Sequence, residues 1–440
     1  MNAGAARNIL AAVASLALAA SCATNETDAL PKLDAPPRPV SFSPPLVERG
    51  AKLAAIGDCR GCHTAQGGRA FAGGRALETP FGTIYATNIT PDTKTGIGLW
   101  SEAAFRRAMH EGVDRGGHHL YPAFPYDRFT LASDEDIRAI YAYLMTRPPV
   151  PARHPPNRLS FPFNVRSFIG VWKALYFHPG RWRDDPSRDA RWNRGGELAE
   201  GLGHCGSCHS PRNALGAERR DRHFDGGDAE GWHAYAIGAT SQSPLAWTED
   251  AMRGYLRDGW QARHGVARGP MASVTRELAH ADEGDLAAIA HYIVSGMGHA
   301  QERGAGEANA GSTNAAGERL YRDACAQCHD GDEPLPFGGL ALARSIGVAG
   351  ESPRNLVNVI LYGLPAAGDR TAPIMPGYAG AMSDEQVIAL ARYLRSRFSD
   401  RPPWQDLASV VGKAREDGER IARAPAGGAG LDPALWGAKR

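Results

Sequence analysis

The chain has 440 residues, 43% of them hydrophobic, and its 49 Lys and Arg residues almost balance 48 Asp and Glu residues. This length allows two to four domains. The formal net charge of +1 gives no electrostatic reason to bind nucleic acid or another highly charged polymer.

The N-terminus predicts an export signal over residues 1–22. Arg7 precedes an apolar run, Ile9 to Ala20, that is too short to span a bilayer and ends in small residues. The stretch LAASC, which ends at Cys22, is similar to a bacterial lipoprotein cleavage site. Ordinary signal cleavage without a lipid is the alternative. We therefore expect a periplasmic protein, soluble or attached to the inner membrane by a lipid anchor or through its complex.

The other six cysteines form three CxxC pairs, each followed directly by a histidine. A disulfide, a zinc site or a thiol-exchange site could explain CxxC alone. The histidine argues against all three, because in CxxCH the thiols add to the vinyl groups of haem and the imidazole becomes the proximal iron ligand. The sequence thus predicts three covalently bound haem c groups, on Cys59, Cys62 and His63, on Cys205, Cys208 and His209, and on Cys325, Cys328 and His329.

Each motif lies between two predicted helices, which indicates that the chain contains three copies of one unit. The leading helices fall in residues 46–59, 194–205 and 316–325. The closing helices, residues 133–146, 282–295 and 383–396, each place apolar residues at i, i+3, i+4 and i+7, with serine caps at Ser133 and Ser383. We predict an all-α fold of three tandem cytochrome c-like domains, each around one haem.

The predicted boundaries follow the motifs and the composition of the segments between them. The segment 161–177, FPFNVRSFIGVWKALYF, is expected to pack between the first two units, with docking to a catalytic subunit or to a membrane surface as the alternative. The tail is expected to lie along another surface or to be partly disordered. The predicted parts are domains at 42–150, 189–298 and 316–400, an aromatic and proline-rich connector at 151–188, a flexible linker at 299–315 and a C-terminal tail at 401–440.

The first two units match further along the chain. Their alignment places Trp100 on Trp247, Tyr85 on Tyr235 and Gly112 on Gly259, and Gly363 takes the glycine position in the third unit. Counting from these glycines locates the sixth iron ligand, which in cytochrome c is usually a Met thioether from the loop before the last helix.

Met271 and Met375 each lie twelve residues after their glycine and are the candidate ligands. A buried core Met is the alternative for either. In the first unit the same position is Phe124, which cannot bind iron, and Met109 falls at an apolar helix position. His118 and His119 precede Phe124, and His119 is the preferred ligand, followed by an open five-coordinate haem.

With these residues in view, the chain resembles the three-haem cytochrome c subunits of membrane-associated periplasmic dehydrogenases, of the alcohol, gluconate, aldehyde or molybdenum hydroxylase type. The likeness covers about Leu46 to Arg397 and includes FGTIYATNITPDTKTGIGLWSEAAF and WNRGGELAEGLGHCGSCHSPRNALGAE. It implies that a catalytic subunit oxidises the substrate while the haems pass electrons to ubiquinone or a terminal oxidase. It also assigns the three CxxCH motifs, Met271 and Met375 as haem and iron ligands. YPAFPY, around Phe124, favours a molybdenum hydroxylase partner.

The sequence has no motif of a substrate-oxidising site, so the leading function is that of a non-catalytic electron-transfer subunit in an oxidoreductase complex. One alternative is a multi-haem enzyme in which an open first haem reduces peroxide. Another is a free periplasmic electron shuttle without a fixed partner.

Overall fold

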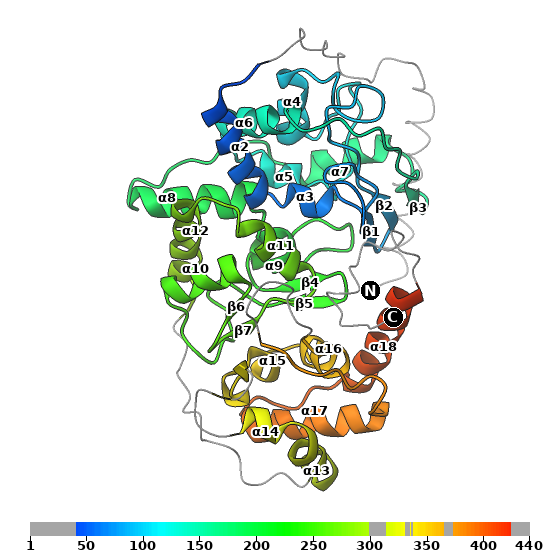
Figure 1. Ribbon diagram of the computed structural model, residues 1–440, viewed down its shortest axis with the longest axis vertical. Helices are drawn as coiled ribbons and strands as arrows, with labels where there is room; N and C mark the ends of the chain where they lie inside the picture. The colour runs from blue at the N-terminus through cyan, green and yellow to red at the C-terminus, as the bar shows by residue number, and fades with distance from the viewer. Residues whose placement is uncertain (1–40, 299–313, 331–334, 336–337, 365–372, 424–440) are drawn as a thin grey trace, which may run out of the picture.

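The computed structural model describes residues 41–298, 314–330, 335, 338–364 and 373–423 (Figure 1). The predicted export signal, Cys22 and nearly all of the predicted linker lie outside these residues. In Figure 1 the first unit is at the top, the second in the middle and the third at the bottom. None of the described helices has the length and apolar character needed to span a bilayer.

In the first unit, helices surround the first motif, and three short strands form a small sheet. The strands β1, β2 and β3 pair antiparallel in that order. The elements are α2 (Pro44–Ile56), α3 (Cys59–Cys62), β1 (Ala76–Thr79), β2 (Gly82–Tyr85), α4 (Glu102–Glu111), α5 (Tyr126–Phe129), α6 (Asp134–Met145), β3 (Arg158–Leu159) and α7 (Ser167–Tyr176).

The second unit repeats this order with two two-stranded antiparallel sheets, β4–β5 and β6–β7. Its leading helix passes into a π-helical turn just before the second motif. The elements are α8 (Ala190–Gly196), η1 (Glu197–Leu202), α9 (Gly206–His209), η2 (Arg220–Arg222), β4 (Gly227–Ala229), β5 (Trp232–Ala234), α10 (Glu249–Asp258), β6 (Trp260–Gln261), β7 (Gly265–Val266), α11 (Pro270–Leu278) and α12 (Glu283–Gly296).

The regular elements among the described residues of the third unit are all helices, and an isolated β-bridge joins Leu364 to Met375. The last helix, α18, lies within the predicted tail and buries Leu407, Val411 and Ala414 against the rest of the unit. The elements are α13 (Ala315–Ala324), α14 (Ala326–His329), η4 (Leu342–Arg344), α15 (Ile346–Ala349), α16 (Arg354–Tyr362), α17 (Asp384–Phe398) and α18 (Leu407–Arg423).

The prediction of an all-α fold is therefore too narrow, and the fold is mostly α. The strands arise where the chain folds back after the first and second motifs, because adjacent extended segments satisfy their backbone groups by pairing. The predicted serine caps are confirmed, since Ser133 accepts a hydrogen bond from the Asp136 amide and Ser383 forms a capping box with Gln386.

The same helix crossing occurs in all three units. Gly50, Gly195 and Gly317 lie on the leading helices, and a Cβ on any of them would overlap a backbone carbonyl of the closing helix, α6, α12 or α17. Glycine is therefore required at each crossing because the two backbones touch. This shared geometry supports the interpretation of the chain as a threefold repeat.

Buried apolar side chains of the described residues form two clusters. One joins the first two units and includes Leu53, Ile140 and Ile289, whereas the other belongs to the third unit. Met109 is buried in the first cluster, as expected for a core residue. The first two units thus share one core.

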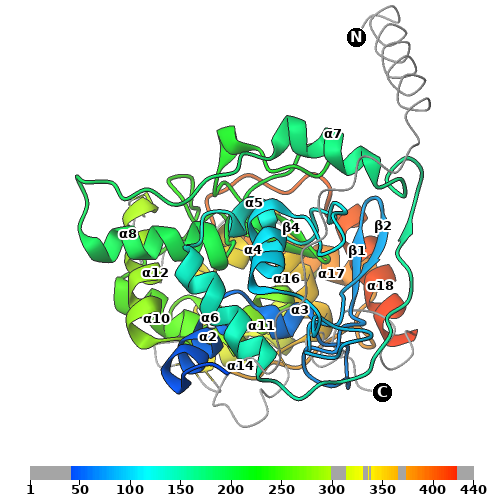
Figure 2. The same cartoon turned by 90° about the horizontal axis from the view of Figure 1, so that it is seen from above.

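The expectation that the segment 161–177 packs between these units is wrong for most of it. It forms α7 at the outer edge of the molecule, at the top of Figure 2. Only Ile169 and Lys173 of the helix are buried, and large apolar side chains face outward.

A buried charge network ties the first unit to the second. Arg128 of α5 donates to Glu200 over 2.9 Å and also pairs with Glu218. His223 lies 2.7 Å from each of these two carboxylates, and Tyr292 donates to Glu200 over 2.9 Å. Burial opposes the charge on His223, but the two hydrogen bonds outweigh it and raise its pKa to about 9. Burial likewise opposes the charge on Glu218, yet its bonds to His223 and Arg128 lower its pKa to about 2.

We expect this network to make stability depend on pH. The contribution of His223 is complete below its ordinary pKa of 6.5 and declines as pH rises through about 9, because the imidazole then loses its proton. The free energy of unfolding should fall by about 1–2 kcal/mol over this window. Denaturant unfolding of the haem-loaded protein at a series of pH values measures it. The His223→Ala variant should lose the alkaline decline, and the exposed control His280→Ala should keep it. An unchanged decline in His223→Ala would show that another group causes it.

Candidate haem-binding sites

The histidine of each CxxCH motif is held in the same way. His63 Nδ1 lies 2.7 Å from the Thr87 carbonyl oxygen, His209 Nδ1 lies 2.7 Å from that of Tyr235, and His329 Nδ1 lies 2.8 Å from that of Leu340. A carbonyl can only accept, so each Nδ1 carries the proton and donates. Nε2 then keeps its lone pair free to bind a metal. A metal-binding histidine is commonly oriented in this way, by a hydrogen bond from its other ring nitrogen.

Burial keeps these groups uncharged. It lowers the pKa of His63 and His209, so both imidazoles are neutral. It also raises the pKa of Cys59 and Cys205 to about 12 and that of Cys325 to about 11. All six thiols of the motifs are free of disulfides. Two buried thiols beside an imidazole whose Nδ1 is already engaged suit covalent haem attachment.

The hydrogen bonds around the motifs correct the alignment of the first two units. Gly73 donates to the His63 carbonyl just as Gly226 donates to that of His209, both over 2.8 Å. Together with the Nδ1 acceptors, these bonds make Thr87 the counterpart of Tyr235. The alignment of Tyr85 with Tyr235 is therefore wrong by two residues. The group that accepts the hydrogen bond from the histidine is a backbone carbonyl. The side chain at that position therefore could not guide the alignment.

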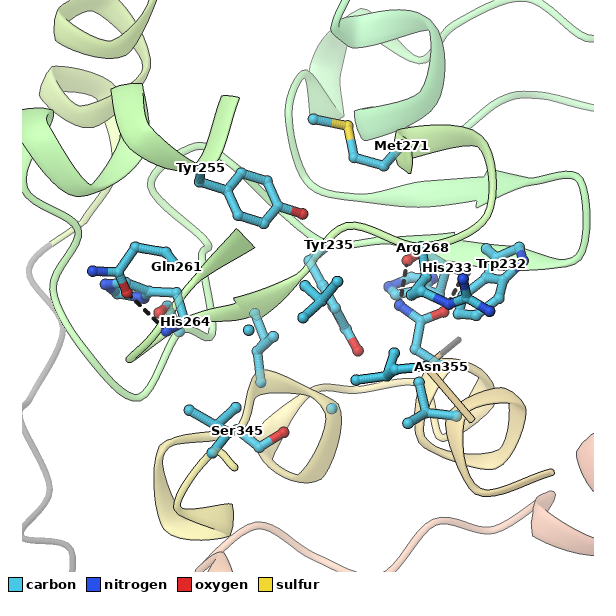
Figure 3. Close-up of a pocket in the computed structure, with 18 of the residues that line it drawn as sticks. Trp232, His233, Tyr235, Tyr255, Gln261, His264, Arg268, Met271, Ser345 and Asn355 are labelled. Carbon is cyan, nitrogen blue, oxygen red and sulfur yellow. Dashed lines mark hydrogen bonds between the residues drawn. The ribbon is translucent and has the colours of Figure 1, made fainter. Parts of the chain in front are cut away.

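The second and third motifs open into one cavity of about 450 Å³. Met271 stands at the start of α11 and extends into this cavity (Figure 3). The structure thus brings both predicted methionines onto the walls shared with their motifs. The predicted ligands that line the cavity are Cys205, Cys208, His209, Met271, Cys325, Cys328, His329 and Met375.

The donor atoms of this cavity suit two haem groups, one at each motif. Each half offers two thiols, an imidazole with Nδ1 already engaged and a thioether. Most of the remaining lining is apolar or aromatic and includes Ile237, Leu256 and Ile360. A haem bound here would supply reversible one-electron chemistry, while these residues hold it and exclude water.

The loop before the last helix has the same register in the first two units. Leu120 donates to the Gly112 carbonyl and Ala267 donates to that of Gly259, both over 2.8 Å. Four residues later the chains reach Phe124 and Met271. Phe124 packs on Phe129 with ring centroids 5.3 Å apart and contacts the shared core. The structure thus supports the count that places a phenylalanine where the second unit has its methionine.

The two candidate histidines of the first unit do not lie free beside Phe124. His119 Nδ1 is 3.2 Å from Lys173 Nζ, and the His119 carbonyl accepts a 2.8 Å hydrogen bond from Arg166. Its ring also faces Gly170, so it rests on α7. His118 is exposed, with Nδ1 3.2 Å from Asp114. Ligation by His119 stays a prediction, and it would require the imidazole to turn away from Lys173.

The first motif abuts the second. His204, which precedes Cys205, hydrogen-bonds the backbone of Gly57, two residues before Cys59. Arg75 and Glu230 form a largely buried ion pair of 3.0 Å between the same two units. The three motifs therefore follow one another along the molecule, with the second in the middle.

Residues that the sequence analysis missed fix the third unit on the second. Asn355 of α16 accepts from the His233 amide over 2.9 Å and donates to the His233 carbonyl over 2.7 Å. Arg354 donates to the Gly231 carbonyl over 2.7 Å. The Tyr235 ring extends from the second unit toward α15 and α16 across the cavity (Figure 3). No motif marks these residues, because their role depends on contacts between distant segments.

Comparisons with known proteins agree with this geometry. Residues 47–148 match the family description "Cytochrome c", and residues 312–394 match "Cytochrome C oxidase, cbb3-type, subunit III". The chain is 47% identical to one of the subunits of nicotinate dehydrogenase from Pseudomonas putida over 387 residues, which are 86% of this chain and 33% of that relative. It therefore spans only a third of the length of that relative.

Two further relatives match along most of both chains. The fructose dehydrogenase cytochrome subunit of Gluconobacter japonicus is 33% identical over 88% of this chain and 86% of its own length. The gluconate 2-dehydrogenase cytochrome c subunit of Pantoea cypripedii is 35% identical over 84% of this chain and 90% of its own length.

Proposed function

Because this chain belongs to the family of cytochrome c subunits of dehydrogenases, we propose that it carries three c-type haems and passes electrons from a partner periplasmic dehydrogenase to the respiratory chain. The proposed acceptor is ubiquinone or a terminal oxidase. The observation that carries the proposal is the repeated geometry of the three histidines, each with Nδ1 donated to a carbonyl and Nε2 left for iron.

The residues have distinct proposed roles. The six cysteines of the motifs anchor the porphyrins, and His63, His209 and His329 are the proximal ligands. Met271 and Met375 complete the second and third irons, and a thioether there favours the reduced state. The cavity common to the last two sites, and the contact of the first motif with the second, support electron transfer along a row.

The proposed partner is a catalytic dehydrogenase subunit of the molybdenum hydroxylase type. Two features support it: the YPAFPY sequence at Phe124 and the 47% identity to a subunit of a nicotinate dehydrogenase. Nicotinate is an N-heterocyclic acid, so we propose a related heterocycle as the substrate class. The substrate would be oxidised on the partner, and this chain would receive only electrons.

Electron paramagnetic resonance of the protein purified from its own membranes tests the proposal. We expect low-spin ferric signals of the His/Met type from two haems, a co-purifying large subunit, and loss of these signals when the substrate of that subunit is added. A chain that elutes alone and stays oxidised would contradict the relay. A high-spin signal from the first haem that responds to peroxide would instead favour the multi-haem enzyme.

A further inference from the structure

The outward side of α7 and the residues leading into it form an apolar surface, which we call the outer α7 face. Phe161 is 78% exposed, Val171 51% and Leu175 60%. Single exposed apolar side chains are common, but five large ones within one short segment are not. The face consists of Phe161, Val165, Phe168, Val171 and Leu175.

The segment that carries this face has basic residues but no acidic ones. Residues 137–183 contain no Asp or Glu, although the whole chain has 48 of them. The exposed arginines Arg153, Arg158 and Arg183 lie before and after the face along the sequence. The basic residues of the stretch are Arg138, Arg147, Arg153, Arg158, Arg166, Lys173, Arg181 and Arg183.

We propose that the outer α7 face docks on an anionic phospholipid surface, with the helix lying in the plane of the interface. An apolar helix face with aromatic residues enters the boundary between headgroups and acyl chains, and flanking cations bind the anionic headgroups. Lipid satisfies both features at once, whereas a water-soluble partner would need an apolar patch ringed by acids. The binding is independent of electron transfer and does not rest on the proposed function.

The inner side of the same helix is attached to the loop of the first haem site. Lys173 donates to the Glu111 carbonyl, and Arg166 donates to that of His119 over 2.8 Å. In Figure 1, α7 and the first unit lie at the end of the molecule opposite the third unit. Docking through the outer α7 face would therefore bring the loop of the first haem site close to the bilayer.

Flotation of the full haem-loaded chain with vesicles tests this proposal. All samples carry Cys22→Ser, so that no lipid anchor contributes. One set of vesicles contains equal parts of phosphatidylcholine and phosphatidylglycerol, and the other contains phosphatidylcholine alone. We expect binding to the mixed vesicles and at least about tenfold weaker binding to the neutral ones, because about 1 kcal/mol per basic residue is lost.

Variants locate the face. The triple variant Phe161→Ser, Val171→Ser and Leu175→Ser should weaken binding to the mixed vesicles by at least about tenfold, because these side chains no longer enter the bilayer. Arg153→Ser with Arg183→Ser should also weaken it, while the control Arg263→Ser, at an exposed arginine of the second unit, should not. The conservative pair Val171→Leu and Leu175→Phe should bind as before. Haem absorbance and the unfolding midpoint show whether each variant is folded.

Three outcomes would overturn the proposal. Equal binding to neutral and mixed vesicles would exclude the headgroup contribution. Unchanged binding of the folded triple variant would move the docking surface elsewhere. Absence of vesicle binding, together with loss in the triple variant of either self-association or the co-purified large subunit, would assign the face to a protein contact.

Discussion

Replacing Cys205 and Cys208 by serine should lower the haem content from three groups per chain to two and interrupt electron transfer between the first and third sites. A serine hydroxyl does not add to the vinyl groups, so His209 alone would have to hold the haem. The second motif lies between the other two, next to the Cys59 motif through His204 and on the same cavity as the Cys325 motif. Loss of the second haem should therefore lower the rate of electron transfer by much more than one third, which is the share of haem that is lost.

The haem-to-protein ratio, from the pyridine haemochrome spectrum and the intact mass, measures the first effect. The rate of quinone reduction by the intact complex measures the second. Cys22→Ser is the matched control, because it removes a cysteine outside the motifs and should keep all three haems. A double variant that retains three haems would contradict haem attachment at Cys205 and Cys208. A variant with two haems and an unchanged rate of quinone reduction would contradict electron transfer through the second site.

Replacing Phe124 by methionine should give the first haem a thioether ligand and raise its reduction potential. The loop register places position 124 where the second unit has Met271, and a thioether favours ferrous iron more than imidazole does. The shift should be a sizeable part of the roughly 0.8 V range that axial ligands cover. A spectroelectrochemical titration that follows three separate haem potentials measures it.

Controls separate ligation from packing. Phe124→Leu changes the same packing against Phe129 without adding a ligand, and it should leave the potential nearly unchanged. His119→Ala should lower the low-spin signal of the first haem if that histidine is the native ligand. Identical potentials in the Phe124→Met and Phe124→Leu variants would show that position 124 does not reach the iron.

The sequence by itself determined the chemistry and the repeat. Haem attachment needs two thiols and an imidazole at fixed spacing on one short helix, so the three CxxCH motifs are complete within five residues each. The leading and closing helices were also predictable, because their apolar period and serine caps are local properties. The count from the glycines also starts from a local property, because Gly112, Gly259 and Gly363 all have positive φ and end the helix before the loop.

Only the tertiary structure decided which groups support the sites and which surfaces remain exposed. The acceptors for the three histidines are backbone carbonyls, which every residue type offers, so sequence alignment chose Tyr85 where the structure uses Thr87. Lys173 approaches His119 from a helix more than fifty residues away, which no local pattern reveals. The composition of α7 indicated burial, but burial depends on what packs against a face, and in the fold the outer α7 face has no covering element among the described residues.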